Sequence, residues 1–164
     1  MSSGVEPVII RPMKAEDVDR VLAIAAGLKD APQWSRAVYE GIVDPVDGAA
    51  GSLPRFALVA CNSESGLVAG FAVASLVPPE GELETVGVAS EFQRQGIGRR
   101  LVNEIGKNLR LRGVTKVLLE VRDSNLAARG LYRSLGFIEM NRRASYYIDP
   151  IEDAVLMRLD VEDD

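Results

Sequence analysis

The chain reads Gln93-Arg94-Gln95-Gly96-Ile97-Gly98 between a strand predicted over residues 82–89 and an amphipathic helix predicted over residues 97–111. A strand that turns through glycines into a helix leaves backbone N–H groups without partners, and these groups bind anions together with the helix dipole. A glycine has no Cβ, so a phosphate can lie against the main chain there. Positive charge comes from Arg94, Arg99 and Arg100. The stretch therefore predicts a pyrophosphate-binding loop.

Two other phosphate-binding loops do not fit these glycines. A Walker loop needs a lysine followed by Ser or Thr after its last glycine, whereas Arg99 follows Gly98. A dinucleotide-binding loop needs Gly-x-Gly-x-x-Gly with an acidic residue about 20 positions later, and the glycines here come in another order. Glycines between a strand and a helix can also serve turn geometry alone, so the loop by itself leaves a structural role open.

Length and composition indicate one globular domain. The 164 residues suffice for a single domain with a sizeable core, and we expect residues 1–7 and 161–164 to form flexible tails. Apolar residues make up 47% and charged residues 26%, which is ordinary for a globular protein. The sequence shows no apolar run long enough to span a membrane and no signal-peptide pattern. A single cysteine suits a reducing compartment, so we expect a cytoplasmic protein without a membrane partner, either a monomer or a homodimer.

The chain contains no histidine. This excludes Ser-His-Asp and Cys-His catalysis and, with Cys61 as the single cysteine, an ordinary zinc site, so no metal is expected. A general base must then be a carboxylate, a tyrosine, a lysine or water. The net charge of −5 argues against nucleic acid as a partner. It is compatible with a cationic partner such as an amine, or it merely aids solubility.

Strand and helix patterns alternate along the chain. The loop-rich segment 44–54 contains several Asp, Gly and Pro residues. Periodicity predicts strands over residues 8–12, 55–61, 66–77, 82–89, 115–121, 137–147 and 153–159, and helices from residue 14 to about 25 and over residues 33–43, 97–111 and 125–135. This order implies an α/β fold with a mixed sheet.

Two motifs together resemble a known family. Residues 93–98 follow the pattern Gln-x-x-Gly-x-Gly, and Leu131-Tyr132-Arg133-Ser134-Leu135-Gly136-Phe137 comes after a strand and Asn125. These are similar to the acetyl-CoA pyrophosphate loop and motif B of the GCN5-related N-acetyltransferases (GNAT). The resemblance implies acetyl-CoA as co-substrate. It also implies the GNAT fold, a mixed, mostly antiparallel sheet of six to seven strands flanked by about four helices.

A more specific resemblance is to the RimI-type ribosomal-protein-alanine N-acetyltransferases. It is carried by Glu120-Val121-Arg122, Arg142-Arg143, Tyr146-Tyr147 and residues 152–157. It implies an acyltransferase that moves acetyl directly from acetyl-CoA to a primary amine, with a protein N-terminus as the acceptor, for example that of a ribosomal protein. Two alternatives stay open: acetylation of a small-molecule amine or polyamine on the same fold, and a non-catalytic CoA-binding module.

The RimI-type resemblance also implies catalytic roles. Glu120 takes the position of the proposed general base and Tyr132 that of the general acid. A tyrosine with its ordinary pKa near 10 stays protonated at neutral pH and can donate to a thiolate. Glu84 is the alternative base, because many acetyltransferases of the superfamily carry a glutamate on that strand. Strand alternation predicts that it shares a face with Glu82, Val86 and Val88. Alternatively, Glu120 is a strand-end carboxylate paired with Arg122 or another arginine.

The same resemblance suggests where acetyl-CoA binds. The expected contacts are Val86, Val88, Gln93, Arg94, Gln95, Gly96, Ile97, Gly98, Arg99, Asn125, Ala128 and Tyr132, and Val88 would offer its backbone groups to the pantetheine. Helical spacing predicts two faces on the helix 125–135. Asn125, Ala128 and Tyr132 would follow the pantetheine, while the other face, formed by Ala127, Leu131 and Leu135, would pack on the sheet.

Acceptor binding is implied, again by resemblance, for Trp34, Tyr146 and Tyr147. Trp34 can equally be a core residue, and the tyrosine pair can simply cap the sheet. Two departures from the RimI-type pattern bear on the acceptor: the strand sequence Leu83-Glu84-Thr85-Val86-Gly87-Val88, and the long loop 44–54 on the expected substrate side. The acceptor can therefore differ from that of the family.

Overall fold

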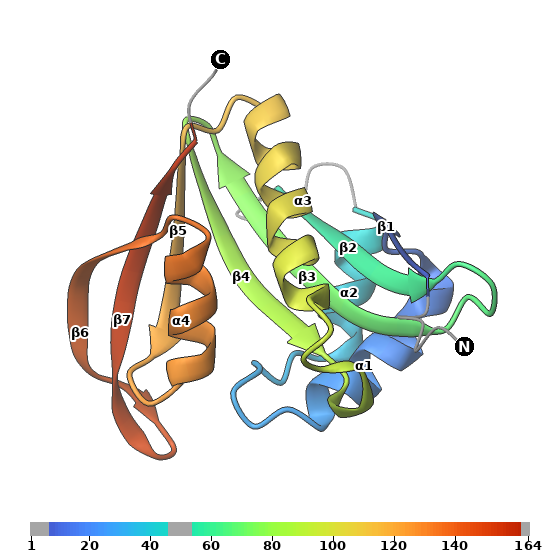
Figure 1. Cartoon of the computed structure of the whole chain (residues 1–164), viewed down its shortest axis with the longest axis horizontal. Coiled ribbons are helices and arrows are strands. Elements are labelled where there is room, and N and C mark those ends of the chain that lie inside the picture. Colours follow the sequence, from blue (N-terminus) through green and yellow to red (C-terminus); the bar gives the residue numbers. More distant parts are fainter. Residues whose placement is uncertain (1–6, 46–53, 162–164) are drawn as a thin grey trace, which may run out of the picture.

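The computed structural model describes residues 7–45 and 54–161, and in these ranges seven strands form one sheet (Figure 1). The strand order is β1-β2-β3-β4-β5-β7-β6. Only β4 and β5 are parallel, and the other neighbours are antiparallel. The strands are β1 (Val8–Pro12), β2 (Arg55–Asn62), β3 (Val68–Val77), β4 (Glu80–Val88), β5 (Lys116–Arg122), β6 (Ile138–Ile148) and β7 (Ile151–Asp160). The predicted α/β fold with a mixed, mostly antiparallel sheet is confirmed.

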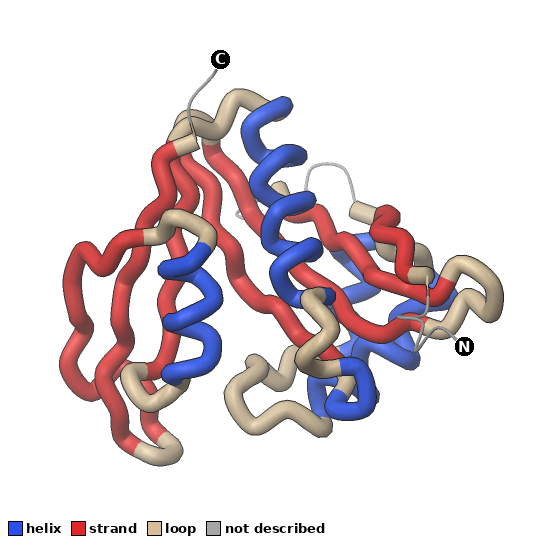
Figure 2. The backbone as a smooth tube through the Cα atoms, in the orientation of Figure 1, coloured by secondary structure: helices blue, strands red, loops and turns tan. Residues whose placement is uncertain are grey.

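Helices cover both faces of this sheet (Figures 1 and 2). The α-helices of the described ranges are α1 (Val18–Ala26), α2 (Arg36–Val43), α3 (Ile97–Leu111) and α4 (Leu126–Ser134). Helices α1 and α2 lie on one face, and α3 lies on the other, with α4 next to β5 and β7. The apolar stripe predicted for α3 is buried as expected: Ile97, Leu101, Val102, Ile105 and Leu109. No helix in the described part of the chain is long and apolar enough to cross a membrane.

Some element boundaries differ from the prediction. The helix expected from residue 33 begins at Arg36, because Ser35 caps it: the Ser35 Oγ accepts a hydrogen bond from the Val38 N–H at 3.4 Å. Gln33 stays in the loop, where its side-chain amide donates to the Ala25 carbonyl at 2.8 Å. Residues 1–6 and 162–164 of the expected tails, and residues 46–53 of the loop 44–54, lie outside the described residues.

The two parallel strands separate soon after they meet. The pairing of β4 with β5 runs over Glu80, Gly81 and Glu82, opposite residues 116–118. Beyond these pairs the two strands diverge, so the sheet is split into a β1–β4 part and a β5–β7 part that are joined at one end (Figure 2). The backbone groups that β4 turns toward the gap are therefore not used in sheet pairing.

A β-bulge in β4 changes which side chains share a face. Val73 of β3 pairs with Thr85, and Ala74 pairs with Leu83, so Glu84 is the extra residue. Leu83 packs in the core under α3, as do Val86 and Val88, which are three and five residues further along the strand. The prediction that Glu82, Glu84, Val86 and Val88 share one face is wrong, because the bulge shifts the alternation at Glu84.

Candidate active site

A cleft of about 670 Å³ lies between the separated strands. Its walls come from β4, β5, α4, the loop between α1 and α2, and residues 93–99, which comprise the turn before α3 and the first residues of α3 and are called the 93–99 loop below. Most of the predicted site residues line it: Glu84, Val86, Val88, Gln93, Arg94, Gly96, Ile97, Gly98, Arg99, Glu120, Asn125, Ala128, Tyr132 and Tyr147. Gln95 is exposed and is not among the described residues that line a cavity.

The loop before α3 has the backbone geometry of an anion-binding turn. Arg94 and Gly96 adopt positive φ angles of 65° and 79°, and Gly96 precedes the first helical residue. The Arg100 N–H donates to the Gly96 carbonyl at 3.1 Å. The N–H groups of residues 97–99 lie before this bond and point out of the helix end. A Cβ at Gly96 would meet nothing within 4 Å, so the glycine is not needed for lack of space. It is needed for its left-handed backbone conformation.

Side chains fix this loop to the neighbouring elements. The Gln93 Nε2 donates to the Val88 carbonyl at 3.0 Å, which joins the loop to the end of β4. The Arg99 guanidinium donates to the Ser134 Oγ at 2.7 Å, which joins the start of α3 to the end of α4. The Val88 carbonyl therefore already accepts one hydrogen bond.

Helix α4 starts as predicted, at an asparagine cap. The Asn125 Oδ1 accepts a hydrogen bond from the Ala128 N–H at 3.2 Å. The predicted division of its faces is confirmed for Asn125, Ala128 and Tyr132, which line the cleft, and for Leu135, which packs against the core, but it is wrong for two residues. Ala127 and Leu131 line the cleft instead of packing on the sheet, whereas Tyr132 contacts both the cleft and the core. The helix lies at the edge of the cleft, so the same side of the helix contacts both the cleft and the core.

Tyr132 lies deep in the cleft wall. Its ring packs against Phe137 with 5.7 Å between ring centroids, at an interplanar angle of 60°. Burial, and secondarily the nearby Tyr147, raise the pKa of the Tyr132 hydroxyl to about 12. The hydroxyl is therefore a proton donor throughout the physiological pH range.

Glu120 lies on β5 at the junction of the cleft and a second cavity. Its carboxylate is 3.6 Å from the Arg143 guanidinium, so an arginine partner exists, but it comes from β6 and is not Arg122. The Tyr146 hydroxyl also hydrogen-bonds Glu120, and this bond raises the pKa of the tyrosine. Glu120 thus faces the cleft, and its contacts with β6 are made by Arg143 and Tyr146.

Glu84, the alternative base, is held by Arg55 of β2. The two N–O distances are 2.7 and 2.9 Å, so both carboxylate oxygens are engaged. The Arg55 guanidinium also lies 5.5 Å from the centroid of the Trp34 ring. Sequence reasoning missed Arg55, because 29 residues separate it from Glu84 and no local pattern links the two.

The second cavity, of about 370 Å³, adjoins the cleft. Glu84, Glu120, Arg122 and Tyr147 line both, and the second cavity also contains Trp34, Tyr146 and Glu82 among its lining residues. The three predicted acceptor residues are therefore brought together, one in the shared wall and two in the second cavity. Trp34 also packs against the core below α1 and α2, so its side chain contacts both the core and the second cavity.

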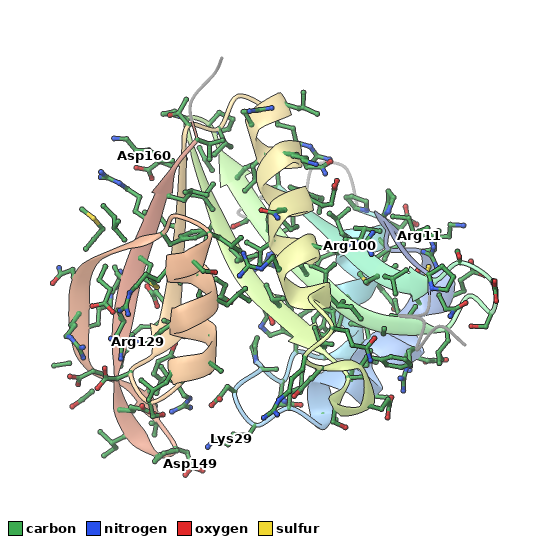
Figure 3. All side chains as sticks on the ribbon, in the orientation of Figure 1. Arg11, Lys29, Arg100, Arg129, Asp149 and Asp160 are labelled. Carbon is green, nitrogen blue, oxygen red and sulfur yellow. The ribbon has the colours of Figure 1, made fainter. Side chains whose placement is uncertain are left out.

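One further contributor, the segment 29–32, was missed, and a second, Arg122, was expected only as an ion-pair partner of Glu120. The segment 29–32 between α1 and α2 lines both cavities, and Figure 3 shows Lys29 at the end of the molecule where β4 and β5 are furthest apart. The Arg122 guanidinium contacts Glu152 at 3.4 Å and Asp30 at 3.8 Å and lies 4.2 Å from the Tyr147 ring centroid. The expected pairing of Arg122 with Glu120 is not formed, since the ion-pair partners of Arg122 are Glu152 and Asp30.

The fold and the cleft are those of a family of acetyl-group transferases. The model of the acetyltransferase (GNAT) family matches residues 28–137, and the chain belongs to this family. The match spans α2 to α4, so it includes the 93–99 loop, Glu120 and Tyr132.

Within this family, the chain is similar to several named N-acetyltransferases. It is 43% identical over 101 residues to the ribosomal protein bS18-alanine N-acetyltransferase of Escherichia coli K12, covering 60% of this chain and 68% of that protein. It is 36% identical over 168 residues to the N-alpha-acetyltransferase RimI of Mycobacterium tuberculosis, covering 99% of both. The crystal structure of the ribosomal-protein-S18-alanine N-acetyltransferase from Escherichia coli superposes with a TM-score of 0.77 at 32% identity, covering 96% of both chains. The chain is thus an N-acetyltransferase of the GNAT family, similar to RimI enzymes.

Proposed function

We propose that this protein transfers the acetyl group of acetyl-CoA to the α-amino group of a protein N-terminus. The observation that carries the proposal is the adjoining pair of cavities, one ending at the 93–99 loop and the other lined by Trp34, Tyr146 and Tyr147. Glu120 lines both cavities, so a group between them can contact both substrates. The similarity to an N-alpha-acetyltransferase over 99% of the chain supports this choice of acceptor. We also take the whole chain to act as one domain, since its first and last strands belong to one sheet.

Acetyl-CoA fits the first cavity. The outward N–H groups of residues 97–99 would bind the pyrophosphate, with positive charge from Arg94 and Arg99. The open space above Gly96 leaves room for a phosphate at the main chain. The pantetheine arm would then pass between Val86–Val88 of β4 and the α4 residues Asn125, Ala128 and Tyr132. This path ends where Glu120 lies.

The reaction needs two proton transfers, and two side chains are placed for them. The neutral amine attacks the thioester carbonyl, so a C–N bond forms and the C–S bond breaks. Glu120 would accept the proton that the amine loses, and Tyr132 would donate its proton to the leaving thiolate. An N-terminal ammonium has a pKa near 8, so a carboxylate acting directly or through water suffices as the base. Tyr132, with its pKa of about 12, carries its proton when the thiolate forms.

Glu120 is the better candidate for the base. Both oxygens of Glu84 are engaged by Arg55, so a proton acceptor there would first have to break an ion pair. Glu120 has a single guanidinium contact, at 3.6 Å, and a phenol neighbour. A partly exposed carboxylate of this kind can exchange a proton without losing a two-point ion pair.

The test is release of the CoA thiol in the presence of candidate acceptors. We expect turnover with peptides that begin with a free α-amino group, and mass spectrometry should place the acetyl group on that nitrogen. The same peptides with an N-acetylated terminus serve as controls. Turnover with polyamines but not with peptides would instead support a small-molecule acetyltransferase. Tight CoA binding without any turnover would support a non-catalytic binding module.

A further inference from the structure

Tyr146 and Tyr147 are consecutive residues of β6, yet both line the second cavity. Their ring centroids are 5.1 Å apart, and the rings meet edge to face at 85°. In a regular strand, consecutive side chains point to opposite faces of the sheet. A local departure from strand geometry is therefore needed to bring both rings to one cavity.

The departure is a large bulge in β6. Arg143 pairs with Ala154 of β7, and Tyr147 pairs with Glu152, so residues 144–146 lie opposite Asp153 alone. At the centre of the bulge, Ser145 adopts a φ of 52°, a left-handed conformation that L-residues other than Asn and Asp rarely adopt. Such a conformation persists only where its surroundings hold it.

Asp153 stabilises this bulge. Its Oδ1 accepts a hydrogen bond from the Ser145 N–H at 3.0 Å, in the middle of the bulge. Its own carbonyl accepts a hydrogen bond from the Asp123 N–H at 3.1 Å, after the end of β5. Asp153 thus connects the bulge, through its side chain, to the end of β5, through its backbone carbonyl.

We propose that the hydrogen bond from Ser145 to Asp153 positions Tyr146 and Tyr147 for acceptor binding. Asp153 and Ser145 are positioning residues, because they act through the tyrosines and do not line the cavities. The bulge brings the Tyr146 hydroxyl to Glu120 and places the Tyr147 ring 4.2 Å from the Arg122 guanidinium. Loss of the bond would let β6 return to regular alternation and would take one ring out of the second cavity. This inference rests on the proposed function for its kinetic consequence.

The test compares two substitutions at each residue of the bond. Asp153→Ala removes the acceptor oxygen, whereas Asp153→Asn keeps one. Ser145→Val puts a β-branched side chain at a positive φ, whereas Ser145→Gly tolerates that angle. We expect Asp153→Ala and Ser145→Val to raise the KM for an N-terminal peptide at least fivefold, with the KM for acetyl-CoA unchanged. Asp153→Asn and Ser145→Gly should stay within twofold of the wild type. Asp160→Ala, which removes an exposed carboxylate of the same strand, is the matched control.

Hydrogen exchange of the Ser145 amide gives a readout that needs no substrate. Protection of this amide should be lost in Asp153→Ala and kept in Asp153→Asn. Unchanged protection, or an unchanged peptide KM, in Asp153→Ala would overturn the inference, as would equal impairment of the Ala and Asn variants. Failure of the wild type to acetylate any peptide would instead overturn the proposed function, and the exchange measurement would still decide whether Asp153 holds the bulge.

Discussion

Glu84 and Arg55 form a two-point ion pair across β2, β3 and β4, with N–O distances of 2.7 and 2.9 Å. Glu84 is the extra residue of the β4 bulge, so the bulge turns it toward Arg55 and away from the face of Val86 and Val88. Glu84 and Glu120 both line the two cavities, but Arg55 engages both oxygens of Glu84, whereas Glu120 has a single guanidinium contact, with Arg143 at 3.6 Å.

The first prediction compares these two carboxylates. Glu120→Gln should lower kcat about 100-fold, the scale of a lost general base, with the Kd of acetyl-CoA unchanged. Glu84→Gln should lower kcat less than about tenfold, because that group holds Arg55 and does not take the proton. Steady-state kinetics with calorimetry of CoA binding would decide. A larger loss of kcat in Glu84→Gln than in Glu120→Gln would assign the base to Glu84.

The second prediction concerns Tyr132 and pH. Its raised pKa, about 12, means that the folded protein keeps the phenol protonated through pH 10. The kcat of the wild type should therefore not fall between pH 8 and about 10 through loss of this proton, and Tyr132→Phe should lower kcat at least tenfold across that range. A pH–rate profile of both proteins tests this. An alkaline limb near pH 9 that disappears in Tyr132→Phe would contradict it.

The third prediction tests the anion-binding loop with two glycines. Gly96 has a φ of 79°, so Gly96→Val should distort the loop and raise the Kd of CoA at least tenfold. Gly106, in the middle of α3, is the matched control, because a Cβ there meets nothing within 4 Å. Gly106→Ala should leave CoA binding unchanged and stabilise the fold by about 0.5–1 kcal/mol through helix propensity. Calorimetry and urea unfolding measure the two effects. Equal CoA binding by Gly96→Val and the wild type would remove the loop from the proposed site.

The fourth prediction is a dependence of stability on pH. Burial acts to raise the pKa of Asp17, but hydrogen bonds from Arg11 (2.7 and 3.0 Å) and from the Lys14 N–H (2.8 Å) outweigh it, so the pKa is lowered. A lowered folded-state pKa contributes stability above the ordinary value near 3.8, and this stability is lost as the pH falls through the folded-state pKa.

Asp17→Asn should therefore lower the free energy of unfolding by about 2 kcal/mol at pH 7. The difference from the wild type should shrink as the pH falls below about 4. Urea unfolding at pH 7 and at pH 3 gives both values. Glu16→Gln, which changes an exposed neighbour, should have little effect at either pH. A constant difference between wild type and Asp17→Asn across this range would argue against the ionised pair.

Local sequence patterns predicted the parts of the molecule that local forces build. The α3 stripe follows from helical periodicity, and the α4 cap follows from an asparagine whose side chain reaches the Ala128 N–H. The turn before α3 follows from Gly96, which adopts a positive φ. Most of the acetyl-CoA residues expected from the family resemblance then line one cleft, because they lie within these local units.

The register between strands could not be predicted from local sequence patterns. Alternation placed Glu84 on the face of Val88, and the β4 bulge moved it away. Arg55 could not be linked to Glu84, since their contact depends on how β2 and β4 flank β3. The bulge at Ser145 depends likewise on Asp153 of the next strand. A bulge arises from pairing between strands, and a single strand carries no periodic signal for it.

The sequence by itself determined the order of helices and strands and the glycine turn before α3, because caps, glycines and apolar periodicity act within a few neighbouring residues, and its motifs indicated the family by resemblance. Only the tertiary structure decided which glutamate is held by a two-point ion pair, which arginines contact the carboxylates and how two adjacent tyrosines reach one cavity. Those outcomes depend on the register between strands that are distant in the chain, where a shift of one residue reverses the direction of every side chain.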